Sequence, residues 1–405
     1  MVSVEQAKKI IEANVPSPEA EAVLLKEALF GVLAEDVKAP FPLPVYDNSA
    51  MDGFVLRAGQ TERASSQSPA RFAVRGTIQA GDAPGRALLK NEAYRIMTGA
   101  CVPQGGDAVL AQEEARVKDG FLLVEKPLAK GTNVRRKGEE AEKGSQLLSK
   151  GAQIHPGVMG ILASLGRERV KVYRKPRVSL LATGNELAAP GRPLPLGKIY
   201  DSNSSMVGAA LRAMRLEPLC VRTLPDRLSA IEKAVGEALR KSDVLVLMGG
   251  VSVGEYDYVK EALSRHKAQT LFWKVSQKPG KPLYFARKGR TLVFGLPGNP
   301  WSVFMCFYEY VYPALRRLMG YGRPYLFSAS LPTEASLKAD SGKTLFLKGR
   351  ISLRGGQFRA GVLTRQSSHM ISSLGGANGF MVVPPSSKGV RRGEKVEAHF
   401  LPWLV

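Results

Sequence analysis

The chain has 405 residues, 44% of them hydrophobic, so two to four globular domains are expected. No apolar run approaches the roughly 18 residues of a membrane span, and lysines near the N-terminus exclude a secretory signal peptide. Three scattered cysteines and four isolated histidines predict neither a disulfide framework nor a zinc site. These features together favour a cytoplasmic location. The formal net charge of +22 favours anionic partners, although a basic cellular background explains it equally well.

Two helices are expected at the N-terminus. The first covers residues 3–14, because Ser3 and Gln6 have capping-box spacing and an apolar face follows, made of Val4, Ala7, Ile10 and Ile11. The second covers residues 19–29. A proline-rich, extended connector then leads into the rest of the chain.

The pattern of apolar runs and turn residues predicts three further regions along the chain. Short β-like runs with glycine turns between residues 54 and 140 predict a small β domain inserted between helical parts, and a helix is expected over 158–165. Strands alternate with helices from residue 176 to about 320, which predicts parallel strands and crossover helices. Short strands from residue 323 predict a terminal β domain. The fold class is therefore multidomain, α/β with all-β parts.

A glycine turn after a buried strand carries the strongest local signal, DVLVLMGGVSVGEYDYVK at residues 243–260. The apolar run 244–247 ends in Gly249 and Gly250, and Ser252 and Asp257 follow. Open α/β sheets bind ligands at this edge, and glycine amides there close around an oxyanion. A nearby carboxylate would hold a divalent cation against that anion.

Two motifs add positive charge at other strand ends. In QKPGKP, Lys278 and Lys281 flank a Pro-Gly turn and would converge on a dianion with Lys274, unless the turn is merely solvated. In GLPGNPWS, Asn299 is a good helix cap and Pro300 a good first helical residue of a helix over 301–318. The free amides of that helix start would bind an anion, or the motif only joins a strand to a helix.

Acidic residues stand at further turns. LATGNEL ends a strand with Glu186 at its tip, and IYDSNS places Asp201 before a helix, where a simple cap explains it as well. PVYDNSAMDGF carries Asp52, RIMTGA carries Thr98, and NVRRKGEE reads as a charged loop. Carboxylates together with lysines at strand ends predict a magnesium ion that bridges an anionic ligand.

Taken in order, these motifs resemble those of molybdopterin molybdenumtransferases of the MoeA type, which are related to the E domain of gephyrin. The resemblance extends from Val4 to the C-terminus and includes QSSHMISSLGGAN. It implies an elongated homodimer whose active cleft lies between the α/β domain of one subunit and the small β domain of the other. The implied domains are a linker domain (1–40 and 147–175), a small β domain (41–146), a molybdopterin-binding α/β domain with a parallel-rich sheet (176–322) and a barrel-like β domain (323–405).

The resemblance implies Mg²⁺-dependent insertion of molybdate into adenylylated molybdopterin, with release of AMP. By motif, the functional acids and threonine are Asp52, Thr98, Glu186, Asp201 and Asp257, the lysines are Lys274, Lys278 and Lys281, and the rigid prolines are Pro297 and Pro300. Ser302 corresponds to an oxyanion contact, and Ser367 or Ser368 to another.

The charges of these residues suggest which of them bind phosphate, which bind molybdate and which bind Mg²⁺. We expect Gly249, Gly250, Ser252 and the helix start near Pro300 to cradle phosphate, and Lys278, Lys281 and Ser302 to hold molybdate. Glu186, Asp201 and Asp257 would bind Mg²⁺.

Three positions depart from the family pattern. Glu140 replaces an Asp, Asn185 replaces an Asp beside Glu186, and Trp301 replaces a small aliphatic residue. The longer side chain of Glu140 moves its oxygens by about one methylene, which favours Asp52 over Glu140 as a functional acid.

Other functions stay open. Insertion of tungstate would use the same chemistry, and a gephyrin-like scaffold would need no catalysis. A nucleic-acid partner is not expected, because the basic residues are spread along the chain, and neither is a membrane. The protein partners implied are the molybdopterin adenylyltransferase and molybdoenzyme apoproteins.

Overall fold

The computed structural model describes residues 1–405 except 84–85, 251–257, 386–387 and 404–405. The chain forms two compact units, and the second is inserted in the first. The first unit contains residues 1–34, 153–155 and 169–405, and the second contains residues 35–152 and 156–168. The division into four domains stays a prediction. Within the described residues, no helix combines the length and apolar character needed to cross a membrane.

The first predicted helix is confirmed and the second is wrong. Helix α1 spans Val4–Asn14, and Ser3 and Gln6 exchange the two hydrogen bonds of the expected capping box. Residues 20–24 instead form strand β1 (Ala20–Leu24), followed by the 3-10 turn η1 (Leu25–Glu27). Strand β1 pairs antiparallel with β12 (Arg169–Tyr173), a partner so distant in sequence that no local pattern indicates it.

A six-stranded sheet forms the centre of the first unit, in the order β16-β13-β17-β21-β20-β18. The first four strands run parallel, as the alternation of strands and helices predicted. The last two pair antiparallel, so the sheet is mixed. The strands are β13 (Val178–Thr183), β16 (Pro218–Leu224), β17 (Val244–Met248), β18 (Gln269–Trp273), β20 (Tyr284–Lys288) and β21 (Thr291–Leu296).

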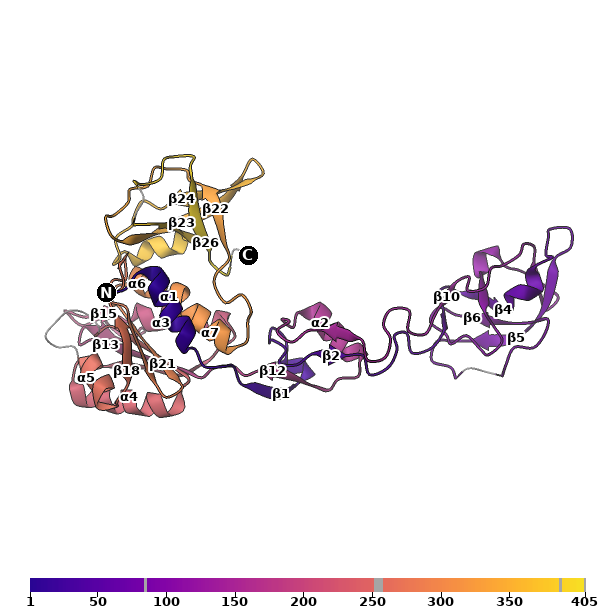
Figure 1. The fold of residues 1–405 in the computed structure, drawn as a ribbon, viewed down its shortest axis with the longest axis horizontal. Helices are drawn as coiled ribbons and strands as arrows, with labels where there is room; N and C mark the ends of the chain where they lie inside the picture. Colours follow the sequence, from indigo (N-terminus) through magenta and orange to yellow (C-terminus); the bar gives the residue numbers. More distant parts are fainter. Residues whose placement is uncertain (84–85, 251–257, 386–387, 404–405) are drawn as a thin grey trace. The chain divides into compact units, whose positions relative to one another are not determined.

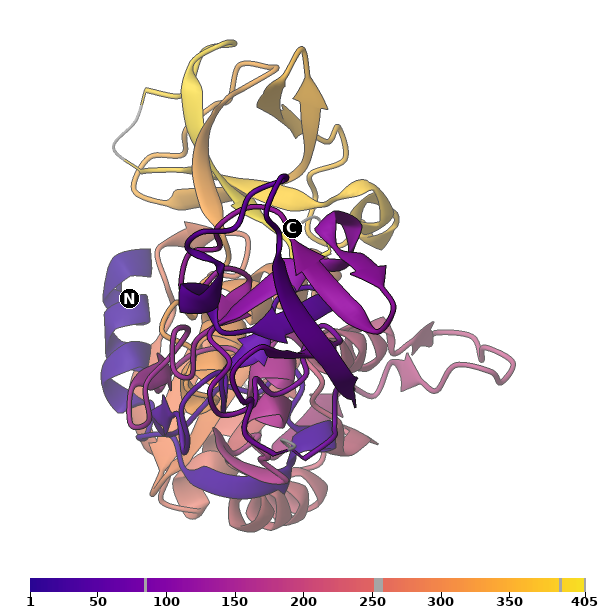
Figure 2. The same cartoon turned by 90° about the vertical axis from the view of Figure 1, so that its right-hand side faces the viewer.

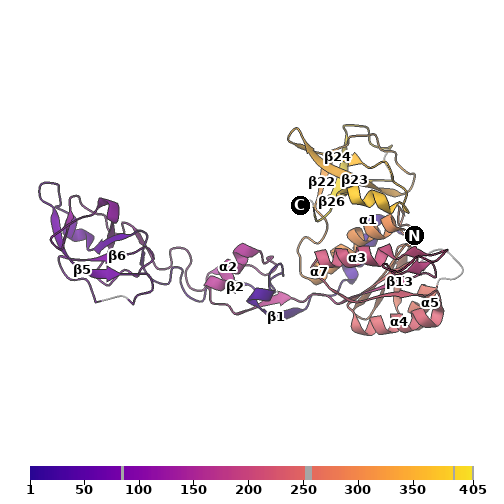
Figure 3. The same ribbon diagram turned by 180° about the vertical axis from the view of Figure 1, so that it is seen from behind.

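Helices cover both faces of this sheet (Figures 1 and 3). On one face, α4 (Leu228–Lys241) and α5 (Tyr258–Arg265) bury apolar side chains against the strands. On the other face lie α1, α3 (Ser202–Ala213) and the helix that follows β21. That last helix was predicted over 301–318, and it consists of α6 (Pro300–Cys306), a π-helical segment η4 (Phe307–Val311) and α7 (Tyr312–Leu318).

The expected C-terminal β part is present and belongs to the first unit. Its sheet has the order β19-β23-β25-β26-β22, with β24 paired to β23. Strand β19 comes from the lysine motif, so this sheet reaches into the α/β part. The elements are β19 (Gln277–Lys278), β22 (Ser328–Pro332), β23 (Thr344–Arg354), β24 (Gln357–Val362), η5 (Ile371–Gly376), β25 (Gly379–Val383) and β26 (Lys395–Phe400).

The second unit is built on a six-stranded sheet of order β7-β4-β6-β5-β9-β8, which Figure 2 brings to the front. The predicted helix over 158–165 is present there as α2 (Pro156–Ser164). The sheet strands are β4 (Gly53–Leu56), β5 (Ala70–Ile78), β6 (Glu92–Ile96), β7 (Ala108–Ala111), β8 (Arg116–Lys118) and β9 (Phe121–Val124). Two short ladders accompany them, made of β3 (Asn48–Ser49) with β10 (Val134–Arg135) and β2 (Val37–Lys38) with β11 (Gln146–Leu148).

Candidate functional site

The carboxyl ends of three neighbouring parallel strands border a cavity of about 800 Å³. Thr183 ends β13, Gly249 follows β17 and Pro297 follows β21. A second cavity of about 570 Å³ adjoins it. The two share five lining residues, which are Thr183, Glu186, Gly249, Gly298 and Asn299. This is the edge at which open α/β sheets bind ligands.

Three lysines line one side of the larger cavity: Lys278, Lys281 and Lys343. Lys278 Nζ lies 3.5 Å from one carboxylate oxygen of Asp340, and Lys343 Nζ lies 3.7 Å from the other. One carboxylate therefore faces two ammonium groups. Lys281 is exposed, and its ammonium has no hydrogen bond or ion pair within the described part of the chain. This side of the cavity thus carries an excess of positive charge.

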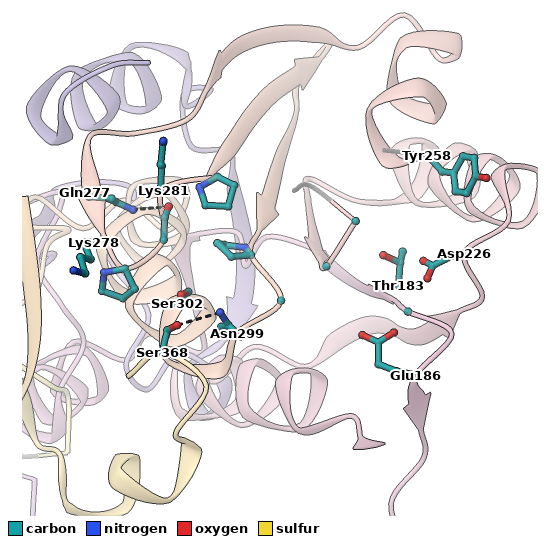
Figure 4. Close-up of a pocket in the computed structure, with 18 of the residues that line it drawn as sticks. Thr183, Glu186, Asp226, Tyr258, Gln277, Lys278, Lys281, Asn299, Ser302 and Ser368 are labelled. Carbon is teal, nitrogen blue, oxygen red and sulfur yellow. Dashed lines mark hydrogen bonds between the residues drawn. The ribbon is translucent and has the colours of Figure 1, made fainter. Parts of the chain in front are cut away.

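Lys278 and Lys281 point in different directions in Figure 4, whereas the sequence predicted that they converge on one spot. The ion pair with Asp340 explains the direction of Lys278. Gln277 holds the turn between the lysines, because its Nε2 donates to Gly280 O at 2.9 Å. Both lysines still border the same cavity. Lys274 does not line it, and its Nζ lies 3.9 Å from the centroid of the Trp273 ring.

Glu186 and Asp226 lie on the opposite side, next to Thr183 (Figure 4). Asp226 Oδ2 accepts a hydrogen bond from Asn185 N–H at 3.0 Å, and Asn185 Oδ1 accepts one from Asp226 N–H at 3.1 Å. This reciprocal pair holds two strand-end loops together, and it shows that an amide serves at position 185 where the family pattern has an acid. The carboxylate of Glu186 has no hydrogen bond or ion pair to any other residue that the structure describes, so both of its oxygens are available to a ligand.

Asp226 was missed by the sequence reasoning. It follows the edge strand β16 and stands in no motif that was singled out. The signal that could have found it is topological: β16 is the parallel neighbour of β13, so its carboxyl end must lie beside Glu186.

Thr183 is the central polar side chain between the two cavities. Its residue is only 4% exposed, and its hydroxyl has no hydrogen-bond partner among the described residues. Gly249 and Gly250, with φ of +82° and +65°, turn directly over it. A Cβ on Gly250 would lie 2.7 Å from the Thr183 hydroxyl. An unsatisfied buried hydroxyl is costly unless a ligand or water completes it.

Asp201 takes the cap role that the sequence left open. One carboxylate oxygen accepts a hydrogen bond from Ser204 N–H at 2.9 Å, and the other accepts from the Ser204 and Thr223 hydroxyls at 2.6 and 3.0 Å. Ser252 and Asp257 lie outside the described residues. Within the residues that the structure does describe, no three His, Cys, Asp or Glu side chains are grouped to hold a metal ion.

The GLPGNPWS turn and the C-terminal β part meet at the edge of the cavity. Asn299 Nδ2 donates to Ser368 Oγ at 3.1 Å instead of capping α6, and Trp301 N–H donates to Ser368 O at 3.0 Å. One helix-start amide that was expected to be free is therefore used. Ser302 is buried and lines the larger cavity with Ser368 and Pro297, and Pro300 lines the smaller one.

Asp52 and Thr98 come together within the second unit. Asp52 Oδ1 accepts hydrogen bonds from Thr98 N–H at 2.7 Å and from the Thr98 hydroxyl at 2.8 Å. These bonds, the main-chain one first, lower the pKa of Asp52. The charged loop is also fixed, because Arg136 pairs with Asp47 at 2.8 Å. Glu140 is exposed, and its main chain donates a hydrogen bond to Leu43 O, the one bond that it makes to a described residue.

Comparisons with known proteins agree along the whole chain. Three family models match: the MoeA N-terminal region (domain I and II) over residues 2–166, a probable molybdopterin binding domain over 179–317, and the MoeA C-terminal region (domain IV) over 330–401. The molybdopterin molybdenumtransferase of Haemophilus influenzae is 36% identical over 98% of both chains. That of Bacillus subtilis is 37% identical over 96% of this chain and 93% of the relative. A crystal structure of a molybdopterin biosynthesis MoeA protein from Pyrococcus superposes with a TM-score of 0.86 at 30% identity, covering 99% of both chains.

Proposed function

Because the chain belongs to the MoeA family of molybdopterin molybdenumtransferases, we infer that its strand-end cavity binds molybdate and adenylylated molybdopterin. The protein is a transferase of molybdenum cofactor biosynthesis. One observation carries the finer proposal. A single cavity has three lysines on one side and two carboxylates on the other. A doubly negative oxyanion fits the first side, and a phosphate-bound cation fits the second.

Molybdate is assigned to the lysine side of the cavity. Lys281 supplies charge that no acid among the described residues neutralises. Lys278 and Lys343 share one carboxylate, and the hydroxyls of Ser302 and Ser368 supply neutral donors at the same edge. Charge-assisted hydrogen bonds of this kind are the strong ones for small dianions.

The phosphate linkage of adenylylated molybdopterin is assigned to the turn above Thr183. Gly249 and the Thr183 hydroxyl, which has no partner among the described residues, line both cavities, so a long ligand can extend through both. Because Gly249 N–H already donates to Leu296 O at 3.1 Å, the Gly250 amide is the donor of this turn that we assign to the phosphate. Pro297 and Pro300 hold the facing wall rigid.

Mg²⁺ is assigned to Glu186 and Asp226, with Asp257 as the further acid that the family pattern implies. The donor set fits, since within the part of the chain that the structure describes the carboxylate of Glu186 is unengaged and Asp226 keeps one oxygen free. Asp201 fits less well, because its carboxylate accepts three hydrogen bonds. When bound, Mg²⁺ neutralises phosphate charge and favours cleavage that releases AMP.

No protein nucleophile is needed for the transfer. Cys101, Cys220 and Cys306 line neither cavity, and burial raises the pKa of the Cys306 thiol far above its usual value. The residues of the cavity hold the two substrates in position, and their charges stabilise the charge that develops during the transfer.

The proposal also includes the oligomeric state, the cellular compartment and the protein partners. We place the protein in the cytoplasm as a homodimer that receives its substrate from the molybdopterin adenylyltransferase and serves molybdoenzyme apoproteins. The three cysteines are free, as a reducing compartment requires.

The test measures AMP release and cofactor formation with Lys278→Ala, Glu186→Ala and the control Lys288→Ala, a lysine on β20 that lines neither cavity. The first variant is expected to raise the KM for molybdate at least tenfold, and the second to lower kcat and shift the Mg²⁺ requirement upward. Full activity of both variants would show that the cavity is not the active site. Replacing molybdate by tungstate in the same assay decides which oxyanion the enzyme prefers.

A further inference from the structure

Lys348 is a completely buried lysine in the middle of β23, with 0% of its surface exposed. Its ammonium donates to Ser373 Oγ at 2.6 Å, Ser367 O at 3.1 Å and Met370 O at 3.4 Å. All three acceptors are neutral, and no carboxylate among the described residues pairs with the ammonium. Burial lowers the pKa of Lys348. Burying an unpaired charge costs free energy, so an apolar residue would suit this position better unless the charge has a role.

The three acceptors belong to one segment, residues 367–373, that reaches the cavity. Within it, Ser368 lines the cavity and meets the start of α6 through two hydrogen bonds. The Lys348 ammonium also lies 5.8 Å from the centroid of the ring of Trp301, whose main chain takes part in that junction. The main chain of Lys348 is tied separately to Gln366, whose side chain accepts from Lys348 N–H at 2.9 Å and donates to Lys348 O at 2.9 Å. The ammonium therefore acts separately from the main chain of Lys348, and it holds the turn that contains Ser368.

We propose that Lys348 is a positioning residue for the oxyanion. Its ammonium gathers the carbonyls of residues 367 and 370 and the Ser373 hydroxyl, so that Ser368 faces the cavity in a fixed orientation. No acid among the described residues pairs with its positive charge, so this charge adds to the attraction that the three cavity lysines exert on a dianion. This inference rests on the proposed binding of an oxyanion at the lysine side of the cavity.

A purely structural support would have different consequences. If Lys348 only stabilised the C-terminal sheet, its replacement would lower the free energy of unfolding without acting through Ser368. A double-mutant cycle separates the two cases, because residues that act through one another are not additive.

The experiment uses the full-length protein and molybdate as the varied substrate. Lys348→Met is expected to raise the KM for molybdate about tenfold with kcat changed less than about threefold, the size of a lost charge-assisted contact. In a Ser368→Ala background the same change is expected to raise KM less than about twofold. Lys348→Arg, which keeps charge and donors, is expected to restore most of the affinity. Arg350→Met, an exposed cation two residues along β23, is the matched control.

The measured KM values decide between the positioning role of Lys348 and a purely structural one. Equal effects of Lys348→Met in both backgrounds, or a wild-type KM in Lys348→Met, would overturn the proposal. Ser373→Ala, which removes one acceptor, takes the place of Lys348→Met in the cycle if that variant does not fold, and additivity with Ser368→Ala would then overturn it. A wild-type KM in Lys278→Ala would instead overturn the proposed function itself. A raised KM in Lys278→Ala together with an unchanged one in Lys348→Met rejects only the positioning role.

Discussion

At the scale of single residues, the site combines groups that motifs reveal with groups that only the fold brings in. Glu186, Lys278 and Ser302 stand in recognisable strand-end motifs, and all three line the cavity. Asp226 and Lys343 stand in no such motif. They reach the cavity because β16 is the parallel neighbour of β13 and because β19 pairs with β23 next to Lys343. Those pairings join segments far apart in sequence, so one chain read locally does not disclose them.

The buried Thr183 hydroxyl leads to a prediction that separates binding from stability. Thr183→Val removes a hydroxyl that has no partner among the described residues, so the free energy of unfolding should change by less than about 1 kcal/mol. The KM for adenylylated molybdopterin should rise about tenfold, and Thr183→Ser should restore it. Urea unfolding and steady-state kinetics measure the two quantities.

The control is Thr223→Val, because the Thr223 hydroxyl donates to Asp201 and lines neither cavity. That variant should lose stability and keep its KM. An unchanged KM in Thr183→Val would remove the hydroxyl from the binding site.

At the scale of elements, the sequence predicts those whose pattern is local. Helix α1 was found from its capping box, and the parallel strands from their apolar runs. Strand β1 was mistaken for a helix, since its five residues carry no strong alternation and are held by distant pairing with β12. The antiparallel strands β18 and β20 were not predicted either. Their direction depends on which edge of the sheet they join, and a local pattern does not contain that information.

A charged network links three elements that the sequence places far apart. Glu309 in the π-helical segment is buried, accepts a hydrogen bond from His399 of β26 and pairs with Lys8 of α1 at 2.6 Å. Burial alone would lower the pKa of His399, but the charge and hydrogen bond of Glu309, with a bond to Glu397, raise it to about 9. The network therefore joins the N-terminal helix, the α/β part and the C-terminal sheet.

This network predicts a loss of stability on the alkaline side. The pKa of His399 is raised, so its contribution is complete below pH 6.5 and disappears as the pH rises through about 9. Its upper limit is roughly 3 kcal/mol. The pKa of Glu309 is lowered to about 2, so that contribution fails only as the pH falls from 4.5 towards 2.

Thermal unfolding at pH 6, 7, 8 and 9 checks the alkaline limb. The wild-type midpoint should fall steadily across this range, and His399→Gln should start lower and change less. The control variant His155→Gln changes a histidine that is not part of this network, and it should keep the wild-type slope. A wild-type curve that stays flat from pH 6 to 9 would contradict the assignment.

At the scale of the whole molecule, the proposed homodimer makes a prediction about mixed subunits. The resemblance implies that the small β domain of one subunit serves the cleft of the other. At subsaturating molybdate, Asp52→Ala and Lys278→Ala should each have low activity as pure dimers, since each lacks one contribution to every site. Dimers formed by unfolding and refolding an equal mixture should recover up to about a quarter of wild-type activity, because half of them are mixed and contain one intact site.

Cofactor formation by the refolded mixture measures that recovery, with each variant refolded alone as the control. No activity above the sum of the two controls would show that both residues act in the same subunit or that the sites are not shared.

The way the chain leaves and re-enters the first unit has a practical consequence. Leu33 bridges Val172 in antiparallel fashion, and Ala34 N–H donates to Lys171 O, so exit and return lie side by side. A hairpin turn of a few residues can span such a gap. Residues 35–168 can therefore be excised, together with the short piece 153–155 of the first unit that they contain, and Ala34 joined to Arg169 by a short glycine turn. The resulting stand-alone core should give a single cooperative melting transition and titrate with molybdate, yet form no cofactor.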